Sequence, residues 1–176
     1  MLTAVATFFI RRAERRIGVS LDYVRYIART ELSLLSRYNK IFGFLDPNRQ
    51  VPAAAYHAAR LRGALAADCG ICVEAEINLA RASGLGEQLI NAILQADSQA
   101  LPTELAPVVR LADAVTSRRE DDVEARSVVT GLYGDAGLIE LSFAMNGAAM
   151  LPGIKRAMGH ATACDLSVMR RLSANQ

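Results

Sequence analysis

The stretch Asp68-Cys69-Gly70-Ile71-Cys72-Val73-Glu74-Ala75-Glu76 holds the one cluster of reactive side chains at a spacing that chemistry would use. Ala-rich segments, which favour helix, precede and follow it. In a helix Cys69, Cys72 and Glu76 fall at positions i, i+3 and i+7 and share one face. The pattern therefore predicts a helix that presents a vicinal dithiol with a carboxylate one turn beyond it.

Outside this stretch the composition is that of a helical globular protein. The chain has 176 residues, of which 52% are hydrophobic, 22% charged and 6% aromatic, with no Trp. This length and balance predict one domain with a sizeable core and exclude a disordered chain. No segment shows the alternation of a strand. We therefore predict an all-α protein that forms a single domain over residues 1–176.

The cysteines and the N-terminus indicate the compartment. Three cysteines are too few for a secreted disulfide framework, and a C-x-x-C pair is more typical of redox or metal chemistry in a reducing compartment. Residues 1–10 are apolar but too short to span a bilayer, and the arginines follow this run instead of preceding it as in a secretion signal. We expect a cytoplasmic protein.

Charge is unevenly distributed along the chain. Residues 1–62 carry eleven Lys or Arg against four Asp or Glu, whereas the remainder carries nine against fourteen. A basic half can attract nucleic acid or an anionic membrane, but solvated helix faces or a subunit contact explain the same charges. We predict no nucleic-acid partner and no membrane partner.

Apolar residues recur at helical spacing through most of the chain, and capping residues and glycines mark the predicted helix ends. The first helix spans residues 2–17, with an apolar stripe of Leu2, Val5, Phe9, Ala13 and Ile17. Further helices are expected to begin near Ser20, Thr30, Pro52, Asp68, Pro102 and Asp122. Three more are expected to span residues 87–96, 136–150 and 154–169. We expect Gly84 to end the helix of the dithiol and Pro152-Gly153 to break the chain.

A helix start at Asp68 would place both cysteines in the first turn, where backbone N–H groups and the helix dipole favour a thiolate. One sulfur could then attack and the other resolve the product as an intramolecular disulfide. The residues alone leave two alternatives open, namely buried structural cysteines and a metal site. A zinc site needs two further ligands, for which the chain offers only His57, His160 and Cys164, so we predict neither a metal nor a cofactor.

Motifs on both sides of the dithiol add a family resemblance. Residues 56–61 read Tyr-His-Ala-Ala-Arg-Leu, the C-x-x-C follows, and residues 78–85 read Asn-Leu-Ala-Arg-Ala-Ser-Gly-Leu. Residues 109–115 and 137–142 continue the series in the expected order. The order resembles that of the AhpD-like (carboxymuconolactone decarboxylase) superfamily over residues 50–160. The resemblance implies a multi-helix bundle with an N-terminal helical extension over 1–50, a core over 51–160, and a C-terminal helix and tail over 161–176.

The same resemblance implies an activity. It is that of an alkylhydroperoxidase-like oxidoreductase with peroxiredoxin-type antioxidant activity, reducing peroxides or disulfides with an external thiol reductant and working as a trimer, hexamer or dimer. By likeness Cys72 attacks the peroxide and Cys69 resolves the disulfide, although the helix dipole alone favours Cys69 as the nucleophile. The family's relay residues are exchanged here, with Glu76 after the pair and His57 before it. Two alternatives follow: His57 and Glu76 share the proton transfer in exchanged order, or the relay is lost and dithiol–disulfide exchange alone remains.

Two other functions stay open. A decarboxylase-like enzyme acting on a small carboxylated substrate would use Arg60 or Arg62 as an anion anchor and His57 or Glu76 as acid or base. A non-catalytic helical oligomer would bury Cys69 and Cys72 as core residues.

Overall fold

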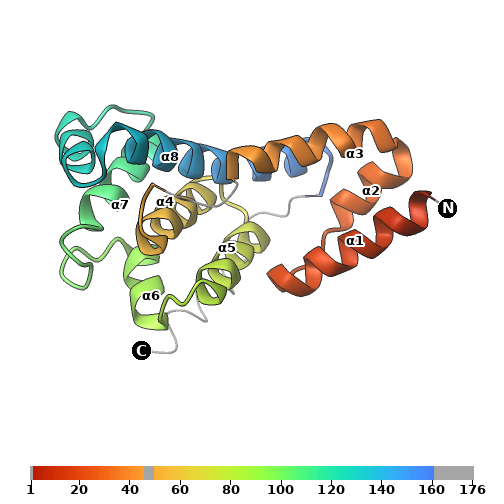
Figure 1. Cartoon of the computed structure of the whole chain (residues 1–176), viewed down its shortest axis with the longest axis horizontal. Helices are drawn as coiled ribbons and strands as arrows, with labels where there is room; N and C mark the ends of the chain where they lie inside the picture. Colours follow the sequence, from red (N-terminus) through yellow and green to blue (C-terminus); the bar gives the residue numbers. More distant parts are fainter. Residues whose placement is uncertain (1, 46–49, 161–176) are drawn as a thin grey trace.

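The computed structural model describes residues 2–45 and 50–160, and within these ranges the chain is all-α, as predicted (Figure 1). The helices are α1 (Leu2–Ile17), α2 (Asp22–Thr30), α3 (Leu32–Asn39), the 3₁₀ helix η1 (Lys40–Leu45), α4 (Ala53–Ala66), α5 (Gly70–Ala82), α6 (Glu87–Gln95), α7 (Ala106–Asp113), the π-helix η2 (Ala114–Arg118) and α8 (Val123–Ala157). The apolar spacing of the helices predicted from Thr30 and Pro102 continues into η1 and η2, but it does not indicate the change of helix type.

Helix α4 is the centre of the molecule, and α5, α6, α7 and α8 pack around it. Its residues are buried on all sides, which is the behaviour of a core helix and explains its many alanines. Gly63 makes the closest approach, because a Cβ at this position would lie 2.1 Å from the backbone oxygen of Met145 on α8. The α4–α8 pair therefore needs a residue without a side chain at this crossing.

The N-terminal helices have a smaller hydrophobic cluster of their own. It contains Ile10, Tyr23, Ile27 and Tyr38, and Leu151 from α8 packs against it. In Figure 1, α1–α3 lie at one end of the molecule and α4–α7 at the other, while α8 runs along both. The division into an extension over 1–50 and a core over 51–160 stays a prediction, as does the single domain, and both are compatible with these two clusters.

The predicted stripe of α1 is displaced. Val5 and Phe9, expected to face the core, are 54% and 61% exposed, and among residues 5–17 Ile10 is the buried one. The sequence does not show which side of α1 is buried, because the side with Val5 and Phe9 and the side with Ile10 both carry apolar residues and the arginines flank both. Leu21 and not Ser20 precedes α2, and Glu31 caps α3 by accepting a hydrogen bond from the Ser33 N–H.

Helix α8 continues where the sequence predicts a break. Pro152 lies inside it and is buried, so the expected interruption at Pro152-Gly153 is wrong. A kink occurs instead at Gly134, whose φ of 69° is not helical, between the helices predicted from Asp122 and over 136–150. The predicted helix 154–169 thus begins as the last turn of α8, and its part beyond residue 160 lies outside the described residues. By length and composition α8 could cross a membrane, a test that core helices of soluble proteins also pass.

Candidate active site

The dithiol lies at the start of α5. Cys69 is the residue that caps the helix, with φ −136° and ψ 100°, and the prediction that Asp68 would be the cap is wrong. Asp68 has a φ of 51° and turns the chain into α5, while Arg156 of α8 donates hydrogen bonds of 3.0 Å to the backbone oxygens of Ala67 and Asp68. The end of α8 therefore holds the turn that places Cys69 at the helix N-terminus.

A buried lysine contacts both sulfurs. The Nζ of Lys155 lies 3.8 Å from the Sγ of Cys69 and 3.5 Å from the Sγ of Cys72. Lys155 is only 4% exposed and Cys69 only 1%, whereas Cys72 is half-buried. Both cysteines are free thiols. A buried ammonium needs a negative partner, and the dithiol supplies one when it loses a proton.

The two thiols titrate as a unit. A hydrogen bond with Cys72 lowers the pKa of Cys69 to about 5 against the opposing effect of burial, and the charge and hydrogen bond of Lys155 add to this lowering. The same hydrogen bond, together with burial, raises the pKa of Cys72. Near neutral pH the pair is therefore a monoanion in which the two sulfurs share one proton. This is the activated state that a dithiol needs for nucleophilic attack.

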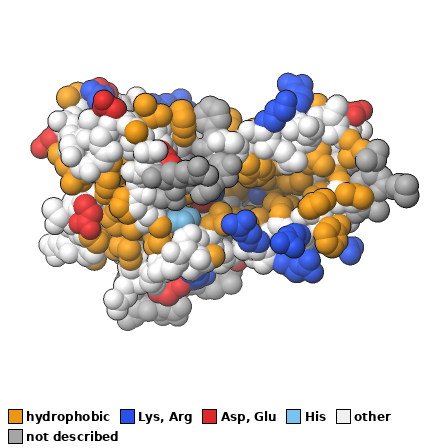
Figure 2. Space-filling view, in the orientation of Figure 1, with side chains coloured by type: hydrophobic (Ala, Val, Ile, Leu, Met, Phe, Trp, Pro, Cys, Tyr) orange, Lys and Arg blue, Asp and Glu red, His pale blue; other side chains and the backbone are white. Residues whose placement is uncertain are grey.

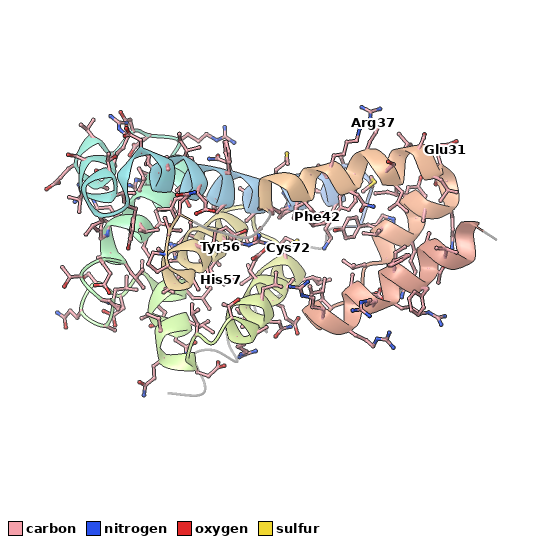
Figure 3. All side chains as sticks on the ribbon, in the orientation of Figure 1. Glu31, Arg37, Phe42, Tyr56, His57 and Cys72 are labelled. Atoms are coloured by element: carbon pink, nitrogen blue, oxygen red, sulfur yellow. The ribbon has the colours of Figure 1, made fainter. Side chains whose placement is uncertain are left out.

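The N-terminal helices form one wall of the site. The Nζ of Lys155 lies 5.2 Å from the ring centroid of Tyr23, a cation–π contact. The hydroxyls of Tyr23 and Tyr38 hydrogen bond to each other, and the two rings pack edge to face at 5.7 Å. Burial is the main reason that the pKa of Tyr23 rises to about 12. Burial also raises the pKa of Tyr38, so both phenols stay neutral, and the Tyr23 ring covers the lysine. In Figure 3, Cys72 lies between α4 and the N-terminal helices.

Glu76, a predicted relay residue, is held in an ion pair. Its two carboxylate oxygens accept hydrogen bonds of 2.6 and 2.7 Å from Arg60 of α4, and both residues are buried. Arg60 also donates to the Tyr56 hydroxyl at 3.0 Å. The carboxylate is thus fully engaged with a guanidinium and joins α5 to α4. This geometry suits a structural clamp better than a proton acceptor.

His57, the other predicted relay residue, bonds elsewhere. Its Nε2 lies 2.8 Å from the Oγ of Ser83, which is at the opposite end of α5 from the cysteines. Burial, followed by the positive charge of Arg60, lowers the pKa of His57 to about 4, so the imidazole is neutral near pH 7. The structure therefore brings Cys69 and Cys72 together with each other and with Lys155, and directs His57 and Glu76 to other partners.

The other described residues named from the sequence have partners other than the dithiol. Arg62 pairs with Asp113 at 2.6 Å, so both proposed anion anchors, Arg60 and Arg62, are already occupied by carboxylates. The ring of His160 packs against Tyr26 at 5.3 Å, and Cys164 lies outside the described residues. Among the described residues, no three His, Cys, Asp or Glu side chains are grouped as a metal would require.

Sequence reasoning missed the residues that define the chemistry. Lys155 is separated from Cys72 by 83 positions, and it follows the Pro152-Gly153 pair that we interpreted as a break. One signal was available, because Lys155 shares a helical face with Leu151, Pro152 and Met158, at spacings of three and four residues. Such a lysine has to be buried with a partner or point to solvent, and only the tertiary fold identifies the partner.

Comparison with known proteins adds no relative. No protein-family model, curated protein or solved structure matches this chain. The AhpD-like resemblance therefore rests on the sequence motifs alone, and a function has to be proposed from the geometry of the dithiol.

Proposed function

We propose that this protein is a thiol-dependent oxidoreductase in which Cys69 and Cys72 cycle between a dithiol and a disulfide. The observation that carries the proposal is the contact of one buried ammonium, that of Lys155, with both sulfurs. Two structural cysteines in a core would gain nothing from a neighbouring cation, whereas a reactive thiolate is stabilised by it. The position of Cys69 at a helix N-terminus acts in the same direction.

The two cysteines differ in access, and this assigns their roles. Cys72 is the half-buried sulfur and Cys69 is 1% exposed, so substrate reaches Cys72 first. In the monoanion, movement of the shared proton to Cys69 leaves a thiolate on Cys72, with Lys155 touching either sulfur. Attack by Cys72 agrees with the role that the AhpD-like resemblance implies for it.

Each step balances in atoms and electrons. The Cys72 thiolate attacks one oxygen of a peroxide ROOH, the O–O bond breaks, and Cys72 sulfenic acid and, after protonation, an alcohol ROH are formed. The Cys69 sulfur then attacks the Cys72 sulfur, giving the disulfide and water. An external dithiol reduces that disulfide by exchange and is itself oxidised. With a disulfide substrate the same Cys72 thiolate forms a mixed disulfide that Cys69 resolves.

Further parts of the proposal come from the sequence resemblance. They are membership of the AhpD-like superfamily, a homo-oligomeric state and a cytoplasmic location. They are independent of the dithiol geometry, so the chemistry can be tested without them.

Turnover of peroxide with dithiothreitol as reductant tests this function, with Cys69→Ser, Cys72→Ser and Cys164→Ser compared with the unchanged chain. We expect both dithiol variants to lose turnover and Cys164→Ser to keep it. Dimedone should trap a sulfenic acid in Cys69→Ser and none in Cys72→Ser. Full turnover by either dithiol variant would contradict the proposal, and a trapped sulfenic acid on Cys69 would exchange the two roles.

A further inference from the structure

Helix α1 exposes a group of large apolar side chains. Phe8 and Phe9 are 58% and 61% exposed, Val5 is 54% exposed, and the two rings pack edge to face at 5.7 Å. Neighbouring exposed aromatic residues are typical of a surface that contacts another protein or a membrane. Figure 2 shows hydrophobic and basic side chains side by side at the end of the molecule where α1 lies.

The same face continues into arginines. Phe8 is followed four residues later by Arg12, and Phe9 seven residues later by Arg16, so these pairs share a side of the helix. The one carboxylate of α1, Glu14, is half-buried and paired with Arg25 at 2.5 Å. Four exposed arginines therefore occupy the second half of α1 without an exposed acidic residue on that helix: Arg11, Arg12, Arg15 and Arg16.

We propose that α1 binds the surface of an anionic lipid bilayer. The binding surface is the α1 patch, made of Val5, Phe8, Phe9, Arg12 and Arg16. Its aromatic half would enter the boundary between headgroups and acyl chains, and its arginines would contact acidic headgroups. This proposal is independent of the redox function.

Charge and polarity select this occupant over two others. A second copy of the chain docked by the same patch in a symmetric dimer would give Arg12 and Arg16 no negative partner from α1, because that helix has no exposed acidic residue. The phosphates of a nucleic acid would pair with Arg12 and Arg16. They would leave Val5 and the edge-to-face rings of Phe8 and Phe9 without an apolar environment. An anionic bilayer offers both, because a helix that lies in its interface contacts acidic headgroups with its basic residues and the acyl region with its apolar residues. The sequence-based expectation of no membrane partner explained the basic half by solvated helix faces or a subunit contact, and the vesicle experiments below test it against this proposal.

Co-sedimentation of the full chain with vesicles is the first test. Vesicles of phosphatidylcholine with about one third phosphatidylglycerol should bind the protein, and pure phosphatidylcholine vesicles should bind it much less. Binding should weaken as salt screens the arginines. Binding to both vesicle types alike, or to neither, would overturn the proposal.

Matched variants locate the surface. Arg12→Glu with Arg16→Glu should weaken binding by about 30-fold or more, because each basic residue near an anionic surface contributes about 1 kcal/mol. Phe8→Ser with Phe9→Ser should also abolish sedimentation. Arg37→Glu with Lys40→Glu makes the same charge change on two exposed residues outside α1 and should bind almost as the unchanged chain does. An equal loss in this control would overturn the assignment to α1.

A single tryptophan reports insertion even where the double variants fold poorly. The chain has no Trp, so Phe9→Trp introduces one emitter at an exposed position. Its fluorescence should shift to shorter wavelength on anionic vesicles, whereas that of Val123→Trp, at an exposed position at the start of α8, should not shift. An unshifted Phe9→Trp spectrum would overturn the proposal. Tighter binding to a DNA oligonucleotide than to vesicles, or a dimer that Phe8→Ser with Phe9→Ser dissociates, would do the same.

Discussion

At the scale of single residues, Lys155 is what distinguishes this dithiol from two cysteines in a core. Its ammonium is almost fully buried and contacts both sulfurs and the face of Tyr23. Isolated burial of such a charge is costly, so the fold that encloses Lys155 also favours a negative charge on the sulfurs. The lysine and the thiolate therefore stabilise one another.

Replacing Lys155 tests this coupling. Lys155→Met should raise the pKa of Cys69 from about 5, and Cys72→Ala, which removes the stronger hydrogen bond, should raise it further. The thiolate absorbance of Cys69 near 240 nm, followed against pH, measures this. Because the pKa is depressed, the unchanged chain should keep its thiolate down to about pH 5, whereas the variants should lose it at higher pH. Lys40→Met, the one other lysine, is the control. An unchanged titration in Lys155→Met would contradict the account.

Replacing Glu76 distinguishes a structural role of this residue from a role in proton transfer. Glu76→Gln should destabilise the protein by about 3 kcal/mol, because it leaves the buried guanidinium of Arg60 without its charge partner. Glu74→Gln, an exposed change on the same helix, should be neutral. Urea unfolding measures both. We expect the rate of disulfide formation in folded Glu76→Gln to be retained. Normal stability with slow disulfide formation would instead restore the proton relay that the AhpD-like resemblance implies.

At the scale of elements, the sequence predicted where most helices lie but not how they face. The caps at Asp122 and Gly84 were identified because local backbone chemistry determines them. Whether Val5 or Ile10 of α1 is buried depends on helices far along the chain, and local periodicity does not contain that information. Pro152 was misjudged for the same reason, since packing of α8 keeps the helix intact across it.

The crossing of α4 and α8 gives an element-scale prediction. Gly63→Ala should cost about 3 kcal/mol of stability, because the new methyl group meets the backbone of Met145, which cannot move as a side chain could. Gly131→Ala on α8 has open space and should be neutral or gain up to about 1 kcal/mol of stability. Thermal unfolding of the reduced proteins compares them. Equal stability of the two variants would show that the helices do not approach this closely.

At the scale of the whole molecule, the dithiol connects two packed clusters. Cys69 caps α5 and Cys72 lies in its first turn, while Lys155 comes from the end of α8 and Tyr23 from the N-terminal helices. The sequence predicted the all-α class and the reactive pair, because a C-x-x-C is a local motif. It could not predict the cation, because Lys155 is brought to the sulfurs only by the packing of α8 against the rest of the molecule.

This connection makes global stability depend on redox state and pH. The folded pKa of Cys69, about 5, lies below its unfolded value, so the thiolate stabilises the reduced protein fully only above the unfolded pKa, and this contribution declines as the pH falls and is lost through about pH 5. The disulfide form has no such titration. The stability of the reduced form relative to the oxidised form should therefore rise by about 2 kcal/mol between pH 5.5 and 7.5. Urea unfolding of both forms in a Cys164→Ser background measures this difference, and parallel pH profiles would refute it.

The most direct measurement is the fate of the thiols after one equivalent of peroxide near pH 7, with mass spectrometry to locate any disulfide. We predict rapid and exclusive formation of the Cys69–Cys72 disulfide in the reduced native protein, and much slower formation in Lys155→Met. Survival of both thiols for hours in the native protein, with reaction only after unfolding, would contradict the claim that Lys155 holds a reactive dithiol. The cysteines would then be core residues.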